Sequence, residues 1–210
     1  MSVRGLFISI EGGEGAGKST VMAALSEALA ARGREVVLTR EPGGTPEGEA
    51  IRGLLLDPGN RLLPETELLL MFASRAQLVR QVVTPALSRG AAVVADRFTD
   101  ASFAYQGGGR GLDKGGIAEL ERWAAGIRPD LTFLLDVDVA EGLARARARG
   151  GEPDRIERER ADFFQRVRDT YLARAAAEPQ RFRVIDAGQP VDEVQRAVLA
   201  ALSVWLGGRE

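Results

Sequence analysis

The segment Gly12 to Thr20 constrains the fold of this chain more than any other. It reads Gly-Gly-Glu-Gly-Ala-Gly-Lys-Ser-Thr and matches the pattern G-x-x-x-x-G-K-[ST] of a phosphate-binding loop. An apolar stretch over 6–10 precedes it, and apolar residues recur at helical spacing after it, from Ala23 to Ala31. A glycine-rich turn without a ligand is the alternative. Because strand, glycine loop and helix follow one another as the motif requires, the sequence predicts a P-loop NTPase fold that binds a nucleoside triphosphate.

Each part of the loop has an expected role. Its glycines let successive backbone N–H groups face a polyphosphate at the positive end of the following helix. Lys18 is expected to reach the β- and γ-phosphates, and the Ser19 hydroxyl to hold Mg²⁺. Every other basic residue except Lys114 is arginine, whose rigid fork cannot replace a compact ammonium. The expected triphosphate-binding residues are therefore Gly12, Gly13, Glu14, Gly15, Ala16, Gly17, Lys18, Ser19 and Thr20.

Composition limits the chemistry. The 210 residues are enough for one α/β domain with a full core, and the net charge of −2 argues against a nucleic-acid partner. The chain has no cysteine and no histidine, which excludes thiolate catalysis, zinc–thiolate sites and the commonest general base. Carboxylates, arginines, one lysine and a hard metal suit phosphoryl transfer. Since there is no membrane-length apolar run and no signal peptide, we expect a cytoplasmic protein without a membrane partner.

Strands and helices alternate along the chain. Strands are expected at 6–10, 36–38, 91–95, 131–136 and 183–186. Helices are expected at 50–56, 64–88, 117–127 and 161–177, with one opening after Asp138 and a last one from about 191. Such alternation predicts right-handed connections and a five-stranded parallel sheet flanked by helices.

Arg75 stands in the middle of the most apolar helix. Its neighbours three and four residues away are Met71, Phe72, Leu78 and Val79, all apolar. A guanidinium in such a place needs an anion or a hydrogen-bond partner. Either it forms an internal salt bridge with an Asp or Glu, or it awaits the phosphate or base edge of a ligand beside an aromatic wall.

Asp96 and Arg97 follow the third strand, at the sheet edge where parallel α/β folds bind ligands. Asp96 is expected to bind magnesium directly or through water, and Arg97 to bind a second phosphate. Alternatively, the two residues only cap the strand.

Polar residues follow this strand. A hydroxyl, a phenol and an amide at Ser102, Tyr105 and Gln106 suit recognition of a base and sugar. The glycines in 107–111 indicate either a loop that moves or a plain flexible connection.

An arginine-rich segment lies near residue 150. Arg145, Arg147 and Arg149 precede Gly-Gly-x-Pro at 150–153, the pattern of a hinge. We expect a short arginine-rich lid over about 145–157 that neutralises charge during transfer. A solvated charged helix face is the alternative.

Together these motifs resemble the bacterial thymidylate kinase family, a group of P-loop nucleoside monophosphate kinases. The resemblance rests on the phosphate loop and on Thr39-Arg40-Glu41-Pro42-Gly43-Gly44-Thr45, Asp96-Arg97-Phe98, Ala104-Tyr105-Gln106-Gly107 and Asp154-Arg155-Ile156-Glu157. It implies one nucleoside monophosphate kinase domain over 1–210. It also implies transfer of the ATP γ-phosphoryl group to dTMP, giving dTDP and ADP for dTTP synthesis, with Mg²⁺ and in a homodimer.

The resemblance also assigns residues to the substrates. Those implied to bind dTMP are Glu14 at the sugar hydroxyl, Phe72 and Arg75 at thymine, Arg97 at the phosphate, Ser102 and Gln106 at the base, and Tyr105 at the 2′ position. The implied catalytic residues are Lys18, Arg97 and a lid arginine, Arg149 or Arg155, because the loop position used in other members is Gly15. One departure is that Met71 occupies the usual position of the stacking phenylalanine, with Phe72 one residue later.

Two other functions are compatible with a phosphate loop. The first is another nucleoside monophosphate kinase or a deoxynucleoside kinase, which differs only in its acceptor. The second is a nucleotide-dependent switch that uses no acceptor. A GTPase switch would need an N-K-x-D element, which neither lysine forms, and a partition-type ATPase would have no use for Arg75 beside Phe72.

Overall fold

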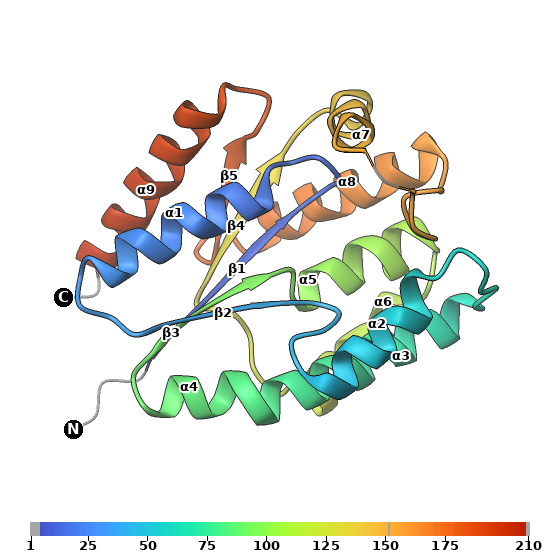
Figure 1. The fold of residues 1–210 in the computed structure, drawn as a ribbon, viewed down its shortest axis with the longest axis horizontal. Helices are drawn as coiled ribbons and strands as arrows, with labels where there is room; N and C mark the ends of the chain where they lie inside the picture. The colour runs from blue at the N-terminus through green and yellow to red at the C-terminus, as the bar shows by residue number, and fades with distance from the viewer. Residues whose placement is uncertain (1–4, 151, 209–210) are drawn as a thin grey trace.

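The computed structural model describes residues 5–150 and 152–208, which form a parallel five-stranded sheet between helices (Figure 1). The strand order is β2-β3-β1-β4-β5, so the P-loop strand is central. All four strand pairs are parallel, which confirms the predicted fold class. The strands are β1 (Leu6–Gly12), β2 (Val36–Arg40), β3 (Ala92–Asp96), β4 (Leu131–Asp136) and β5 (Phe182–Asp186).

Helices cover both faces of the sheet because β1 is apolar on both sides. Ile8 and Ile10 pack in one cluster with α1 (Lys18–Ala30) and α9 (Val191–Gly207). Phe7, which points to the opposite face, packs with η1 (Val79–Val83) and α4 (Thr84–Ser88). This alternation follows from the two-residue period of a strand, and the two layers are visible in Figure 1.

The remaining helical elements agree with the expected spans, with shifted ends, except for the two over 99–109, where no helix was predicted. They are α2 (Pro46–Leu56), α3 (Pro64–Leu78), α5 (Thr99–Ser102), η2 (Phe103–Gly109), α6 (Lys114–Leu120), η3 (Glu121–Ala125), α7 (Val139–Ala148) and α8 (Ala161–Ala177). The predicted helix 64–88 is continuous and contains a π-helical turn, η1. Helix α2 begins four residues earlier than predicted, because the Thr45 hydroxyl accepts the Gly48 N–H at 3.0 Å and caps it.

The glycine run after Gln106 is not a flexible loop. Residues up to Gly109 form the π-helical element η2, which packs tightly on α8. A Cβ at Gly108 would lie 2.2 Å from the Thr170 hydroxyl, and one at Gly109 would lie 2.4 Å from the Phe163 ring. These glycines therefore allow close packing, and the prediction of a loop is wrong for 107–109.

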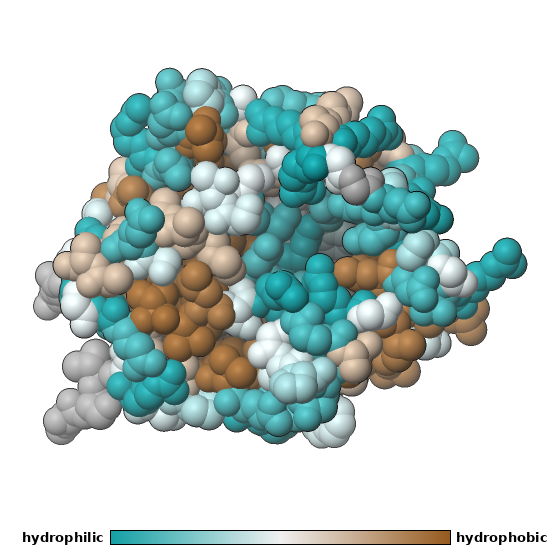
Figure 2. All heavy atoms as spheres, viewed as in Figure 1, coloured by the Kyte–Doolittle hydropathy of each residue, from teal (hydrophilic) through white to brown (hydrophobic). Residues whose placement is uncertain are grey.

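Two further properties concern the molecule's surface and its helices. Hydrophilic side chains gather over the carboxyl-terminal edge of the sheet, while apolar ones gather near its other end (Figure 2). Within residues 5–150 and 152–208, no helix combines the length and the apolarity needed to cross a membrane.

Candidate active site

A cavity of about 290 Å³ opens at the carboxyl-terminal edge of the sheet, where a parallel fold is expected to bind its ligand. Six parts of the chain surround it. They are the P-loop from Glu14 to Ser19, the end of β2 with the loop after it, α2, Met71 in α3, the segment from Asp96 to Tyr105, and Arg149 with the turn near 154–157.

The P-loop takes its shape from backbone conformations that favour glycine. Gly15 and Gly17 have φ of +70° and +85°, in the left-handed region. The Lys18 ammonium donates to the Gly13 carbonyl at 2.9 Å and to the Gly12 carbonyl at 3.4 Å, so it lies over the loop. Burial and the neighbouring Arg97 lower the pKa of Lys18, which marks it as a cation held without full hydration.

Ser19 and Asp96 lie together in the cavity wall and fit a magnesium ion. The Oδ1 atom of Asp96 is shielded from solvent and has no hydrogen-bond partner among the residues described. Within this part of the chain, no three His, Cys, Asp or Glu side chains form a metal cluster. Magnesium sites at phosphates need only one or two carboxylates, since water and phosphate supply the other ligands.

Arg97 is held in a strained conformation at the centre of the wall. Its φ of +69° is unusual for a residue with a side chain. One terminal nitrogen donates to the Gly12 carbonyl at 2.8 Å and the other to Glu14 Oε1 at 2.8 Å. The guanidinium also lies 4.7 Å from the centre of the Tyr105 ring, whose hydroxyl donates to Glu14 Oε1 at 2.9 Å. Strain of this kind concentrates at functional sites.

The charge of Glu14 is fixed by these neighbours. Burial alone would raise the pKa of this carboxyl, but the cations Arg97 and Lys18 outweigh it and hold the pKa below its usual value. Glu14 is therefore ionised and places an anion between two cations at the cavity wall.

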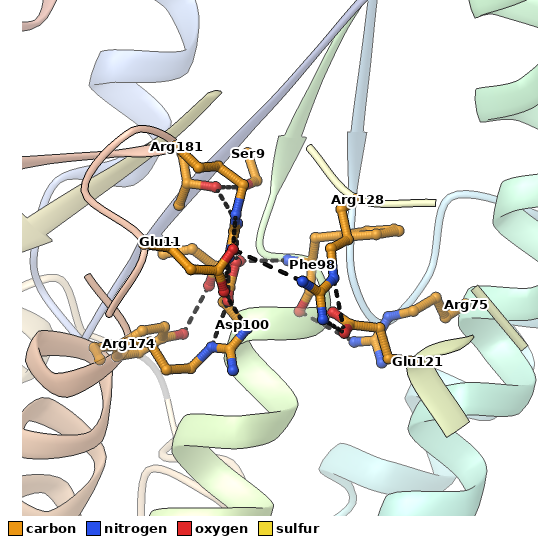
Figure 3. Close-up of polar contacts among 12 residues, drawn as sticks. Ser9, Glu11, Arg75, Phe98, Asp100, Glu121, Arg128, Arg174 and Arg181 are labelled. Atoms are coloured by element: carbon orange, nitrogen blue, oxygen red, sulfur yellow. Dashed lines mark hydrogen bonds and ion pairs between the residues drawn. The ribbon is translucent and has the colours of Figure 1, made fainter. Parts of the chain in front are cut away.

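Glu11 is a buried residue of the site that the sequence analysis missed. Its carboxyl group accepts the Phe98 backbone N–H at 2.7 Å and so supports the peptide that follows Arg97 (Figure 3). It also accepts the Tyr171 hydroxyl at 2.7 Å. Burial, with Asp100 nearby, raises the pKa of Glu11 to about 8. The one sequence feature that could have indicated a role for Glu11 is that an acidic residue stands at the end of an apolar strand.

Arg75 forms an internal salt bridge, which is one of the two roles predicted for it from the sequence. Its Nε donates to Glu41 Oε2 at 2.7 Å, and one terminal nitrogen donates to the Ser102 hydroxyl at 3.0 Å. The other terminal nitrogen donates to the Phe98 carbonyl at 3.2 Å (Figure 3). The side chain is 1% exposed. Burial raises the pKa of Glu41 to about 7 despite its cationic partner. Arg75 thus lies in a second layer behind the cavity wall.

Of the two candidates for the thymine wall, the structure places Met71 at the cavity and Phe72 in the core. Met71 lines the cavity. Phe72 packs with Leu68 and Phe103, and its ring lies 4.4 Å below the Arg75 guanidinium.

Two other predicted base-binding residues are buried beside Arg75. The Ser102 hydroxyl accepts from Arg75, and the Gln106 amide donates to Glu67 at 2.8 Å. The Gln106 carbonyl oxygen has no hydrogen-bond partner in the described part of the chain. Of the predicted acceptor-site residues, the structure brings Glu14, Arg97 and Tyr105 to the cavity itself.

The arginines of the predicted lid differ in their surroundings. Arg149 lies at the cavity and is 61% exposed, with the Glu157 carboxylate 3.9 Å away. Arg155 is largely buried and donates to the Leu55 carbonyl and to Glu67, both at 2.7 Å. Arg145 donates to the Ala187 carbonyl at 2.7 Å. The predicted lid also includes Gly151, which lies outside the described residues.

Close packing explains why residue 15 is glycine. A Cβ at Gly15 would lie 2.0 Å from the carbonyl oxygen of Gly142 in α7. A side chain at this loop position would therefore collide with the backbone of α7.

The fold and the cavity define the class of P-loop phosphotransferases, with a second fixed cation, Arg97, beside the P-loop. The chain belongs to the thymidylate kinase family. The family model described as thymidylate kinase matches residues 10–198.

Individual relatives agree with this assignment. The chain is 59% identical to thymidylate kinase of Chromohalobacter salexigens over 202 residues, covering 95% of each chain. It is 56% identical to thymidylate kinase of Pseudomonas fluorescens over 204 residues, covering 96% of this chain and 97% of the relative. The crystal structure of thymidylate kinase from Ehrlichia chaffeensis has a TM-score of 0.79 at 33% identity, over 95% of this chain and 99% of that chain.

Proposed function

We propose that this protein transfers the γ-phosphoryl group of ATP to dTMP, giving ADP and dTDP for dTTP synthesis. The observation that carries the proposal is that one cavity holds both the P-loop, with Lys18, and a second fixed cation, Arg97, beside Tyr105. A switch that hydrolyses its triphosphate has no need for this second site.

The donor and acceptor are assigned to the two sides of the cavity. ATP lies along Gly12 to Thr20, with Lys18 at its terminal phosphates. The dTMP phosphate binds Arg97, its sugar meets Glu14 and Tyr105, and its base lies against Met71. A second layer of Arg75, Ser102 and Gln106, with Phe72 beneath Arg75, fixes the base-binding wall from behind.

Positioning and charge neutralisation suffice for the reaction. The acceptor phosphate oxygen is already nucleophilic, so in-line alignment needs no general base. We assign the transferring arginine to Arg149, which is exposed at the cavity, while Arg155 has a structural role. Ser19 and Asp96 would hold Mg²⁺, which shields the charge of the phosphates during transfer.

We further propose that the protein is a cytoplasmic homodimer without a nucleic-acid or membrane partner. Leu54 in α2, Leu69 in α3 and Trp123 in η3 are large apolar side chains more than half exposed, on elements that contact one another. A second copy of the chain would cover them. The cytoplasm holds ATP, and the net charge of −2 disfavours nucleic acid. Sedimentation equilibrium tests the dimer, and a monomer at micromolar concentration would contradict it.

Product analysis tests the proposed reaction. With ATP, Mg²⁺ and dTMP, we expect ADP and dTDP in equal amounts, and almost no ADP when dTMP is omitted. ADP release at the same rate without an acceptor would instead favour the nucleotide-dependent switch.

A further inference from the structure

Glu67 in α3 is a buried carboxylate shared by donors from two other parts of the chain. It is 0% exposed. It accepts the Gln106 amide at 2.8 Å, the Arg110 guanidinium at 3.0 Å and the Arg155 guanidinium at 2.7 Å. These donors outweigh the effect of burial and hold the pKa of Glu67 below its usual value, so the group is ionised.

Through Arg155, this carboxylate holds one wall of the active-site cavity. The Arg155 side chain points away from the cavity, toward Glu67 and the Leu55 carbonyl at the end of α2. The Arg155 backbone N–H also donates to the Leu56 carbonyl at 3.0 Å. The residues on either side of Arg155, Asp154 and Ile156, line the cavity, as does Glu157. One buried ion pair therefore fixes where this wall lies relative to α2 and α3.

The same wall carries a carboxylate close to Arg149, the arginine proposed to act in transfer. Glu157 lies 3.9 Å from the Arg149 guanidinium. Its position is set locally by Asp154, whose Oδ1 accepts the backbone N–H groups of Ile156 and Glu157 at 2.8 and 2.9 Å. A displacement of Arg155 would move this turn as a unit, and Glu157 with it.

We propose that Glu67 is a positioning residue for phosphoryl transfer, acting through Arg155 and Glu157 on the Arg149 guanidinium. The inference rests on the proposed function, since it needs Arg149 to act in transfer. It assigns a role to a residue that touches neither substrate. The other guanidinium on Glu67 belongs to Arg110, which also pairs with Glu159 and stacks on Phe163 but does not itself line the cavity.

A double-mutant cycle between Glu67 and Arg149 tests this role. A glutamine at residue 67 keeps the shape but turns an NH₂ group toward donors, so the Glu67→Gln variant should displace Arg155. We expect kcat to fall roughly 10- to 100-fold in Glu67→Gln, as for a small misplacement of a catalytic group. In an Arg149→Ala background, the same substitution should change kcat less than about twofold, because the group it positions is already absent. All rates are taken per folded protein.

Two matched lysine substitutions distinguish an effect on the cavity wall from a general loss of stability. A lysine at 155 keeps the charge beside Glu67 but cannot also hold the Leu55 carbonyl, so Arg155→Lys should lower kcat several-fold. Arg110→Lys changes the other partner of Glu67 and should leave kcat within about twofold of wild type.

The outcomes are distinct. The proposal is overturned if Glu67→Gln keeps the wild-type kcat. It is also overturned if Glu67→Gln lowers kcat by the same factor in the Arg149→Ala background as in the wild type. Should Glu67→Gln not fold, the Arg155→Lys cycle with Arg149→Ala decides in the same way. A wild-type enzyme inactive on dTMP would instead remove the proposed function.

Discussion

At the scale of single residues, Lys18 gives the sharpest test of the donor site. Its ammonium lies on the carbonyls of Gly12 and Gly13 and faces the cavity. The Lys18→Ala variant should lose at least about 100-fold in kcat, because charge that develops on the phosphates is no longer neutralised. Its dissociation constant for dTMP, measured by calorimetry, should stay within about threefold of wild type, since the contacts of Arg97 and Tyr105 remain.

The control for this variant is its thermal unfolding midpoint. An unchanged midpoint with loss of both turnover and dTMP binding would contradict the division of the cavity into donor and acceptor sides.

Met71 and Phe72 offer a matched pair at the acceptor site. Met71 lines the cavity, whereas Phe72 is buried in the core beneath Arg75. We expect Met71→Ala to raise the KM for dTMP by roughly 10-fold, as the base loses about 1–2 kcal/mol of apolar contact. Phe72→Leu should keep that KM within about threefold and lower the midpoint of unfolding. Steady-state kinetics with dTMP measures the KM of both variants. A larger rise in KM for Phe72→Leu than for Met71→Ala would mean that the Phe72 ring contacts the base.

Single residues also show how far a sequence can predict a site. Lys18, Ser19 and Asp96 were predicted because fixed spacing and a strand end determine their positions. The partner of Arg75 could not be predicted, since Glu41 lies 34 residues away and comes close only through the fold. Glu11 carries no motif of its own; its role depends on the backbone of Phe98, which the sheet brings next to it.

At the scale of elements, the contact between η2 and α8 depends on glycine. A Cβ at Gly109 would lie 2.4 to 3.0 Å from three atoms of the Phe163 ring. Gly109→Ala should therefore lower the free energy of unfolding by about 1–3 kcal/mol, as overpacking does. Urea unfolding measures this.

The matched control is Gly53→Ala in α2, where an added Cβ meets nothing within 4 Å and φ is not positive. It should leave stability unchanged or raise it by about 0.5–1 kcal/mol, because alanine favours a helix. Equal effects of the two substitutions would mean that the glycines of η2 serve flexibility after all.

The same element shows why sequence patterns fail locally. Three glycines in a row predict a loop, because glycine lowers helix propensity. In the folded chain, contact with α8 compensates for that cost, and α8 lies more than 50 residues later. Helix α8, whose apolar periodicity is long and regular, was predicted with its observed bounds, and α9 with its observed start.

At the scale of the whole molecule, buried Glu11 links stability to pH. Its pKa is raised to about 8, by burial first and by Asp100 next, against the hydrogen bond from Tyr171 and the charge of Arg97. The unfolded chain has the usual value of 4.5, so between these pH values the folded state binds more protons. The contribution of Glu11 to stability is therefore present below pH 4.5 and is lost as pH rises through 8.

The comparison with Glu11→Gln isolates this contribution. From pH 5 to pH 8 the wild type should lose on the order of 2 kcal/mol more free energy of unfolding than the variant. Other titrating groups, such as Glu41, are common to both proteins and cancel in the difference. A difference that does not change with pH would contradict a raised pKa at Glu11.

The overall architecture was the most predictable property of the chain. Five apolar strands alternating with helices already imply a parallel sheet, and the structure places β1 at its centre. The order of the outer strands and the route of Arg155 to Glu67 depend on packing between distant segments, which no local pattern contains.

The most direct test of the proposed phosphoryl transfer is to measure ADP release with ATP and Mg²⁺ and each of dTMP, dUMP, UMP, CMP, AMP and GMP in turn. We predict strong turnover with dTMP, weaker turnover with dUMP and little with the others, because Tyr105 and Met71 line the cavity on the side where we propose that the acceptor binds. Turnover with AMP or GMP equal to that with dTMP, or ADP release that needs no acceptor, would contradict it.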